Sequence, residues 1–352
     1  MRKRSKLALT LMSIPLATVF LTGCEEGDPR GLAENPIERT EFLLGTVANI
    51  KVFNEGEEEA LDLAFEKVTE LDEWFAKEKE DSQISEVNRQ AGIKPVKVSE
   101  EVFHVMERAL YYAEVSDGKF DPTIGAMTSL WNIGQEDAAV PEEEKLENVL
   151  DVVDYNLVEL NEEEQTIYLE EKGMELDLGA IAKGYITDEA ARILVEEGVN
   201  TAIVDLGGDI VVVGNSTRGE SEPWRVGIQD PFDDRGDIMG MVELVDSAIV
   251  TSGIYERNFE EDGKSYHHIL NPETGYPFEN NISGISIISD NAMDGDAIAT
   301  VAFAMGVEEG LDYINEMPDV DVIYVTKDKK VFTSDNLTHK VEITDEMFEL
   351  VE

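Results

Sequence analysis

Two oxygen-bearing side chains stand one helical turn apart near the end of this sequence. Asp296 and Thr300 lie in an apolar stretch that predicts a helix over 292–305, and their spacing puts them on one face of it. A carboxylate and a hydroxyl there can both bind a hard cation such as Mg²⁺. The same residues also fit a capped helix, in which Asp294 or Asp296 caps the start and Thr300 bonds back to a carbonyl. The spacing alone fits both a cation site and a capped helix.

A second candidate is the turn between a predicted strand, 174–178, and a predicted helix, 181–197. The free N–H groups and the dipole of a helix N-terminus attract phosphate, and Lys183 adds a cation. Asp177, at the end of the strand, can accept a hydrogen bond from a ligand. The turn is neither a Walker loop nor a G-x-G-x-x-G motif. An ordinary connection with a solvated Lys183 is therefore the alternative.

A pair of adjacent histidines precedes a turn at 271–275. His267 and His268 would point to opposite faces of a strand, so we expect at most one in a site and no zinc pair. A histidine that faces a site suits an acid, a base or a phosphate donor, and one bonded to nearby backbone is the alternative. The loops 117–125 and 204–209 are further places where backbone can approach a ligand.

The elements that must position these residues mix without a regular βαβ alternation, which predicts an α+β fold. Apolar spacing predicts helices at 57–75, 99–115, after Pro141, at 181–197, 292–305 and 308–316. Strands are predicted at 41–53, 155–160, 166–169, 174–178, 201–206, 210–213, 224–228, 241–245, 283–288, 320–325 and 330–333.

The start of the chain is typical of a secretory leader. A basic stretch precedes an apolar run over 7–21, and Leu21-Thr22-Gly23-Cys24 resembles a bacterial lipobox. We predict a signal peptide over 1–23, lipidation of Cys24, a polar tether over 24–39 and a folded domain over 40–352. Cys24 is the only cysteine, which excludes an intramolecular disulfide and a thiol nucleophile in the folded part. The predicted location is the extracytoplasmic face of the cell membrane.

The charge of the chain is unusual, with 77 acidic and 28 basic residues. Loss of the leader with its four basic residues leaves 24 basic residues and a net charge of −53. Such a surface repels nucleic acid, which excludes that class of partner. It also repels any anionic cofactor, so a site for one needs its own positive potential. Adaptation of the surface to high salt is the simplest interpretation.

Taken in order, several strings together resemble the ApbE family of flavin transferases (FAD:protein FMN transferases). They span most of the chain. They are Leu43–Thr46, Asp81-Ser82, Asp117–Gly125, Asp177–Gly184, Asp205–Asp209, Thr251–Gly253, His268–Gly275 and Asp296–Thr300.

The resemblance implies a two-lobed α+β fold with FAD bound in a cleft. It implies that the flavin nucleotide is lined by Leu44, Lys119, Phe120, Asp121, Asp177, Lys183 and Leu270. It also implies that Mg²⁺ is held by Asp296, Thr300 and the backbone carbonyl of Ala180. The family often has a methionine where Leu44 stands and a tyrosine where Glu78 aligns, so one stacking contact with the flavin is lost here.

The activity that this resemblance implies is transfer of FMN from FAD to a threonine or serine hydroxyl of an acceptor protein, with release of AMP. The acceptor would be an extracytoplasmic flavoprotein subunit. A metal, Lys183 and Asp296 would stabilise the charge that grows as the diphosphate breaks, and His268 would take the proton of the hydroxyl or hold a phosphate oxygen. A metal-dependent FAD pyrophosphatase and a non-catalytic flavin-binding lipoprotein are the alternatives.

Overall fold

The computed structural model describes residues 31–335, 337 and 339–351, and sheets make up most of its centre. The strands are β1 (Leu32–Leu43), β2 (Thr46–Asn54), β3 (Val96–Lys97), β4 (Val158–Asn161), β5 (Thr166–Leu169), β6 (Ala202–Leu206), β7 (Asp209–Val213), β8 (Trp224–Gln229), β9 (Ile238–Leu244), β10 (Ser247–Gly253), β11 (Asn258–Glu261), β12 (Lys264–His267), β13 (Ile282–Ser289), β14 (Asp321–Thr326), β15 (Lys330–Thr333), β16 (Val341–Ile343) and β17 (Glu349–Leu350).

Helices fill the intervals between groups of strands. Ser99 starts one of them by accepting a hydrogen bond from the backbone of Val102, as predicted. The helices are α1 (Glu58–Phe75), α2 (Gln83–Arg89), α3 (Glu100–Val115), α4 (Gly125–Trp131), α5 (Glu143–Leu150), α6 (Ala182–Glu196), α7 (Ala292–Met305) and α8 (Val307–Asn315), with a 3₁₀ turn at Tyr155–Leu157.

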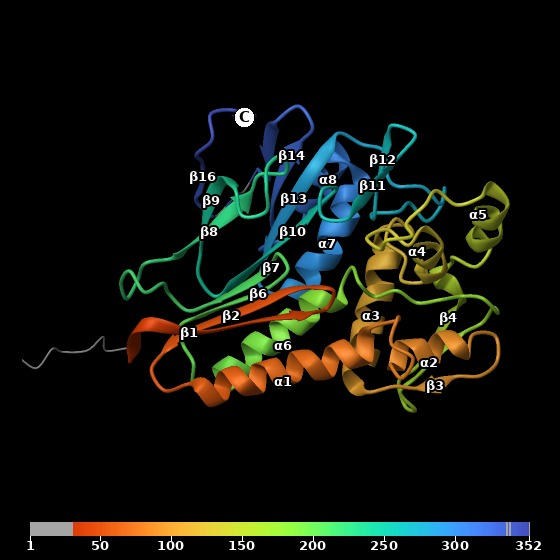
Figure 1. Cartoon of the computed structure of the whole chain (residues 1–352), viewed down its shortest axis with the longest axis horizontal. Helices are drawn as coiled ribbons and strands as arrows, with labels where there is room; N and C mark the ends of the chain where they lie inside the picture. The colour runs from red at the N-terminus through yellow and green to blue at the C-terminus, as the bar shows by residue number, and fades with distance from the viewer. Residues whose placement is uncertain (1–30, 336, 338, 352) are drawn as a thin grey trace, which may run out of the picture.

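A nine-stranded sheet runs through the molecule in the order β1-β2-β6-β7-β10-β13-β14-β15-β17 (Figure 1). Only its last pair is parallel. Alternate residues of its strands enter two different cores, because successive side chains point to opposite faces. Ile287 of β13, for example, packs toward the core that includes α1, α6 and α7, whereas Ile288 joins the core under β8 and β9. The sheet is therefore the middle layer of the fold.

Smaller sheets complete the fold, in the orders β16-β9-β8, β3-β5-β4 and β11-β12. Figure 1 shows α3, α4 and α5 with β4 beyond one end of the long α1 and α6 helices. The observed mixture of antiparallel sheets and helices confirms the predicted α+β class. Within the described residues no helix is both long and apolar enough to span a bilayer.

Several predicted boundaries differ from the structure. β1 already begins at Leu32, so the tether predicted over 24–39 overlaps a strand. The strand predicted at 41–53 is the end of β1 and the whole of β2, separated by a turn at Leu44 and Gly45, both with positive φ. The strand predicted at 174–178 is wrong, because this segment is extended but makes only an isolated bridge, from Glu175 to Ile124.

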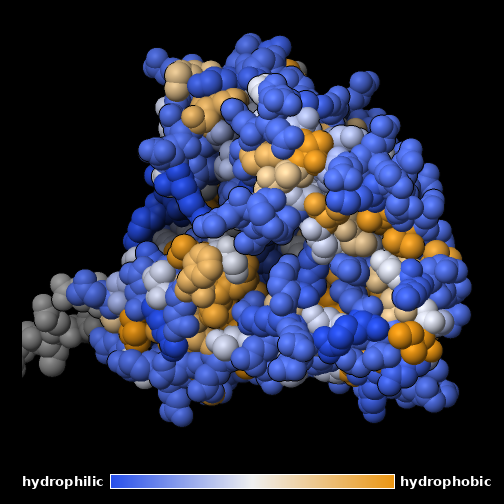
Figure 2. All heavy atoms as spheres, turned by 45° about the vertical axis from the view of Figure 1, so that its right-hand side comes forward, coloured by the Kyte–Doolittle hydropathy of each residue, from blue (hydrophilic) through white to orange (hydrophobic). Residues whose placement is uncertain are grey.

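The signal peptide predicted over 1–23 and the lipidated Cys24 lie outside the described residues. Hydrophilic residues cover most of the face in Figure 2, as the charge of the chain requires, and apolar patches border its hollowed middle.

Candidate functional site

The N-terminal ends of α6 and α7 meet, and each helix supplies a carboxylate to the other. Asp296 of α7 is buried and its Oδ2 accepts a hydrogen bond of 3.1 Å from the backbone N–H of Gly184 in α6. Asp188 of α6 in turn accepts hydrogen bonds from the backbone N–H groups of Ala292 (2.7 Å) and Met293 (2.9 Å) in α7. Both helix starts thus have donors satisfied by the neighbouring helix.

This contact requires a glycine at position 184. A Cβ atom there would lie 2.2 Å from the carbonyl oxygen of Ala292, which is backbone and cannot move aside cheaply. Burial raises the pKa of Asp188 to about 6, although its two backbone hydrogen bonds act in the opposite direction. Asn291, and neither Asp294 nor Asp296, caps α7 by accepting from the N–H of Asp294 (2.8 Å). Asp296 is therefore free of the capping role that the sequence left open.

Lys183 lies between two buried carboxylates beside this contact. Its ammonium forms an ion pair with Asp209, whose side chain is fully buried at the start of β7. Burial acts to lower the pKa of Lys183, but Asp209 and Asp296 together raise it. Burial raises the pKa of both carboxylates, against the charge of Lys183. The negative charge of the two acids thus depends on this ammonium.

Asp209 was not predicted as a site residue. It follows the turn of Gly207 and Gly208, both with positive φ, and a Cβ on Gly207 would lie 2.3 Å from Oγ1 of Thr46. The turn therefore packs tightly against β2 and directs β7 toward Lys183. The signal in the sequence was the glycine pair in the loop 204–209, which indicated a close approach of backbone but no specific partner.

His268 is held through one ring nitrogen. Nδ1 lies 3.2 Å from the carbonyl oxygen of Arg257, which also accepts from the backbone N–H of His268 (3.1 Å). Because a carbonyl only accepts, Nδ1 carries the proton and Nε2 keeps its lone pair. Burial lowers the pKa of His268 to about 4, and the charges of Arg257 and Lys183 act in the same direction. The imidazole is therefore neutral at pH 7, as a proton acceptor must be.

The neighbouring histidine has a different environment, as expected for adjacent residues at the end of a strand. Nε2 of His267 bonds to the carbonyl oxygen of Phe278 (3.0 Å), and its ring packs edge-on against Phe303 at 5.7 Å. His267 thus belongs to the interior. Of the two histidines, only His268 has a pKa that the charge of Lys183 lowers.

Asp177 is tied to the protein itself. Its Oδ2 accepts from Oγ1 of Thr128 (2.7 Å) and lies 3.3 Å from the ammonium of Lys77, while Oδ1 accepts from the N–H of Gly179 (3.0 Å). Burial acts to raise the pKa of Asp177, but Lys77 and these hydrogen bonds hold it below its usual range. Asp177 thus fixes the turn that leads into α6.

The turn at Lys119, Phe120 and Asp121 buries two of its side chains. Phe120 is only 4% exposed, and Asp121 accepts from the backbone and hydroxyl of Thr123 (2.8 and 2.6 Å) and from the N–H of Tyr155 (3.0 Å). Burial raises the pKa of Asp121. Lys119 is partly exposed and lies 3.7 Å from Glu309. Phe120 and Asp121 thus stabilise the turn.

The remaining predicted residues lie at turns or on helix faces. Leu44 adopts a φ of 56° at the turn between β1 and β2, and Leu270 is buried where it bridges to Pro277. Thr300 is half-buried one turn beyond Asp296, and Ala180 precedes α6. Among the described residues no three His, Cys, Asp or Glu side chains cluster as metal ligands, so any cation here would need hydroxyl or carbonyl oxygens as well.

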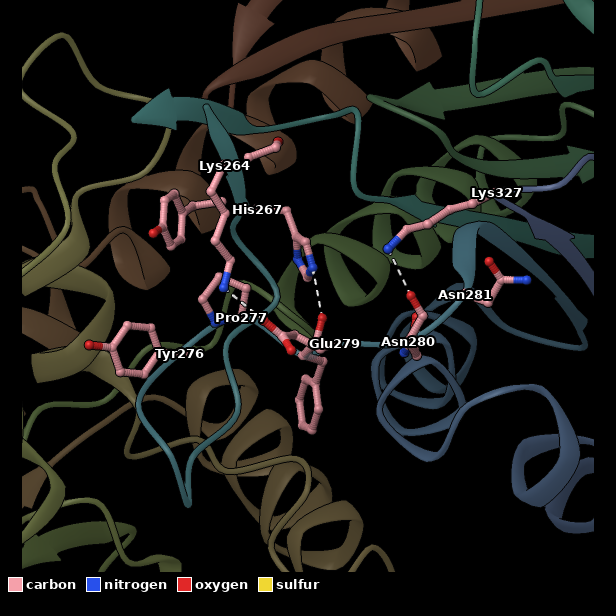
Figure 3. Close-up of a pocket in the computed structure, with 11 residues that line it drawn as sticks. Lys264, His267, Tyr276, Pro277, Glu279, Asn280, Asn281 and Lys327 are labelled. Carbon is pink, nitrogen blue, oxygen red and sulfur yellow. Dashed lines mark hydrogen bonds and ion pairs between the residues drawn. The ribbon is translucent and has the colours of Figure 1, made fainter. Parts of the chain in front are cut away.

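Two clefts lie away from this charge cluster. One, of 460 Å³, is bordered by β12 and the segment 276–281 and is reached by His267 rather than His268 (Figure 3). Lys264 and Lys327 line it, but the first is paired with Glu279 (2.7 Å) and the second with the carbonyl of Asn280 (2.7 Å). The other, of 570 Å³, is lined by Glu78, Asn132, Gln135, Glu136 and Asp137. Neither contains Lys183, His268 or Asp296.

Comparison with known proteins decides the family. Residues 44–324 match the sequence profile described as ApbE family. The chain belongs to the ApbE family. A FAD:protein FMN transferase of Treponema pallidum (strain Nichols) is 36% identical over 327 residues, which cover 89% of this chain and 90% of that protein.

Two further relatives show how far the ApbE likeness extends. A FAD:protein FMN transferase of Klebsiella pneumoniae (strain 342) is 35% identical, over 83% of this chain and 90% of that protein. The crystal structure of the ApbE protein from Thermotoga maritima superposes with a TM-score of 0.76 at 30% identity, over 88% of this chain and 97% of that one. Both likenesses extend over more than four fifths of this chain.

Proposed function

We propose that this ApbE protein transfers FMN from FAD to a threonine or serine hydroxyl of an acceptor protein and releases AMP. The observation that carries the proposal is the 36% identity to a FAD:protein FMN transferase over nearly the whole chain. The charge cluster of Lys183, Asp209 and Asp296 supports it, because a diphosphate needs a local cation on a protein of such negative charge.

In the proposed reaction the acceptor oxygen forms a bond to the FMN phosphorus, and the bond from that phosphorus to the bridging oxygen breaks. The electron pair of the broken bond leaves with AMP. Nε2 of His268 takes the hydroxyl proton, because its lone pair is free and the lowered pKa keeps the imidazole neutral at pH 7. The ammonium of Lys183 and the N-terminus of α6 stabilise the negative charge that develops on the diphosphate.

We further propose that Asp296, Thr300 and the carbonyl of Ala180 hold a divalent cation, most simply Mg²⁺. These are hard oxygen donors, and buried Asp296 receives a single hydrogen bond, from Gly184, so it has capacity for another partner. When bound, the cation would neutralise charge on the diphosphate oxygens.

One assay tests the activity. The purified protein is incubated with FAD, Mg²⁺ and a candidate acceptor protein, and AMP release and the acceptor mass are followed together. The proposal requires that the acceptor gain one FMN. AMP and free FMN formed at the same rate without acceptor would instead assign a pyrophosphatase, and bound but intact FAD would assign a carrier.

The proposed location is the extracytoplasmic face of the membrane, with a lipid on Cys24 and a flavoprotein subunit on that face as acceptor. The string Leu21-Thr22-Gly23-Cys24 supports it. We expect Cys24→Ser to move the protein from the membrane fraction to the soluble fraction, because one acyl-modified residue supplies the anchor. Fractionation with immunodetection measures this, and a variant that stays in the membrane fraction would argue against the anchor.

A further inference from the structure

Arg257 reaches the site by two routes, through its backbone and through its side chain. Its carbonyl oxygen accepts both hydrogen bonds that hold His268, from the backbone N–H (3.1 Å) and from Nδ1 (3.2 Å). Any group that this arginine binds is thus coupled to the position of the histidine. Arg257 lies in the turn between β10 and β11, and none of the predicted site residues included it.

The side chain of Arg257 extends along two glycines toward the turn between β1 and β2. Its Cδ lies 3.2 Å from where a Cβ of Gly134 would be, and its Nη2 lies 3.3 Å from where a Cβ of Gly45 would be. Both glycines have positive φ, 96° and 66°. The absence of side chains at these two positions leaves room for the arginine, and its guanidinium ends beside Gly45.

The guanidinium is exposed and forms no ion pair with any described carboxylate, although the chain has 77 acidic residues. It lies close enough to His268 for its charge to act on the imidazole, as does that of Lys183. The charges of two cations thus act on the histidine of the site. FAD carries two phosphates, and a protein with a net charge of −49 repels it at long range, so its binding requires local cations.

We propose that the guanidinium of Arg257 binds the phosphate oxygens of FAD near His268. This rests on the proposed function, since FAD is the substrate there. A planar guanidinium with several N–H donors fits phosphate oxygens in pairs, which a lysine at the same position cannot reproduce. Arg257 is thus a substrate-binding residue that also holds the histidine in register with the phosphate.

The test compares Arg257→Gln and Arg257→Lys with Arg192→Gln in the full-length protein. Arg192 is an exposed arginine of α6 that pairs with Glu189 and Glu196, so it is a control for the loss of one positive charge. The dissociation constant of FAD is measured by flavin fluorescence without acceptor, and KM values for FAD and acceptor are measured with it. Circular dichroism and thermal unfolding check that each variant is folded.

We expect Arg257→Gln to weaken FAD binding by about tenfold or more, Arg257→Lys to weaken it less, and Arg192→Gln to leave it unchanged. The same order is expected in KM for FAD, with KM for the acceptor unchanged. FAD affinity equal in Arg257→Gln and Arg192→Gln would overturn the proposal. So would a rise confined to KM for the acceptor, which would place an acceptor carboxylate on this arginine.

The binding arm separates this inference from the proposed function. If the wild-type protein flavinylates no acceptor but its FAD affinity still depends on Arg257, the inference holds and the proposed function fails. If flavinylation proceeds but the affinity for FAD is the same with and without the side chain of Arg257, the inference alone fails.

Discussion

At the scale of single residues, the chemistry depends on where protons reside at neutral pH. His268 donates its Nδ1 proton to a carbonyl and keeps Nε2 as an acceptor, because burial and two cations disfavour the imidazolium. Lys183 stays protonated for the opposite reason, since Asp209 and Asp296 surround it. The site therefore combines a neutral base with a fixed cation, which is the pairing that attack of a hydroxyl on a phosphate requires.

This assignment predicts the pH dependence of the reaction. The base form of His268 is the active one, and its pKa is about 4 rather than 6.5. As pH falls, kcat/KM should stay constant through pH 6 and decline only as pH approaches 4. His268→Ala should lower the rate by about 10²- to 10⁴-fold.

Initial rates of AMP release between pH 4 and 9 measure this profile. The control is His104→Ala, which removes an exposed histidine of α3 and should leave both the rate and its profile unchanged. A His268→Ala enzyme as active as the wild type would exclude His268 as the base, and an acid limb centred near pH 6.5 would show that the pKa of His268 is not lowered.

The residue scale is also where the sequence was least informative. Lys183, His268 and Asp296 were identified from their motifs, and they do come together with Asp209. The roles of Asp177 and Asp121 within turns depend on partners distant in sequence, Lys77 and Tyr155, that no local pattern reveals. Arg257 lies in an ordinary polar turn. The direction of its side chain becomes clear only from the structure, where it passes two glycines of other segments.

At the scale of elements, the contact between α6 and α7 positions the proposed cation ligands. Asp296 of α7 accepts a hydrogen bond from the backbone of α6, Asp188 of α6 accepts one from the backbone of α7, and Gly184 permits the approach. A methyl group at position 184 must push the helices apart, because it would meet a backbone oxygen. Gly184→Ala should therefore destabilise the protein by about 1–3 kcal/mol and reduce activity more than its stability loss explains.

Gly219→Ala is the matched control. A Cβ there lies 3.0 Å from Cγ of Glu222, the flexible side chain of a surface residue, and its φ is not in the left-handed region. Urea unfolding and the FMN transfer rate at a temperature where both variants are folded measure the effect. Equal stability and activity of the two variants would mean that the α6–α7 approach does not matter for the site.

Helices with a clear apolar periodicity could be predicted from the sequence. Strands that depend on pairing with distant segments were harder to predict. The apolar stripe of α1 and the cap of α3 gave their boundaries within one residue. β10 was missed because a strand buried on both faces shows no alternation and follows β9 after a tight turn at Asp246. A strand at the adjacent histidines was expected and is β12, but its partner β11 was missed because it is short and polar, and β16 and β17 because they are only two or three residues long.

At the scale of the whole molecule, the acidic composition determines the stability. The net charge of −49 stores electrostatic repulsion in the folded state, and hydrophilic residues cover most of the face shown in Figure 2. Raising the salt from about 0.1 M to about 1 M shortens the screening length from about 10 Å to about 3 Å. The thermal midpoint should therefore rise with KCl.

Differential scanning calorimetry in KCl and in the same concentrations of sorbitol checks this, because sorbitol changes hydration without screening charge. A thermal midpoint that rises equally in both, or falls in KCl, would show that repulsion is not what limits stability. The acidic composition made this prediction possible from the sequence, whereas the layering of nine strands between helices and a small sheet required the structure.

The central claim is that the cluster around Asp296 and Lys183 breaks the diphosphate of FAD to flavinylate a protein. The most direct measurement is the ratio of AMP formed to acceptor flavinylated, for the wild type, Asp296→Ala and Asp290→Ala, an exposed aspartate just before α7. The account predicts one AMP per flavinylated acceptor for the wild type and Asp290→Ala, and neither product for Asp296→Ala. Cation-dependent AMP formation that survives in Asp296→Ala would contradict it.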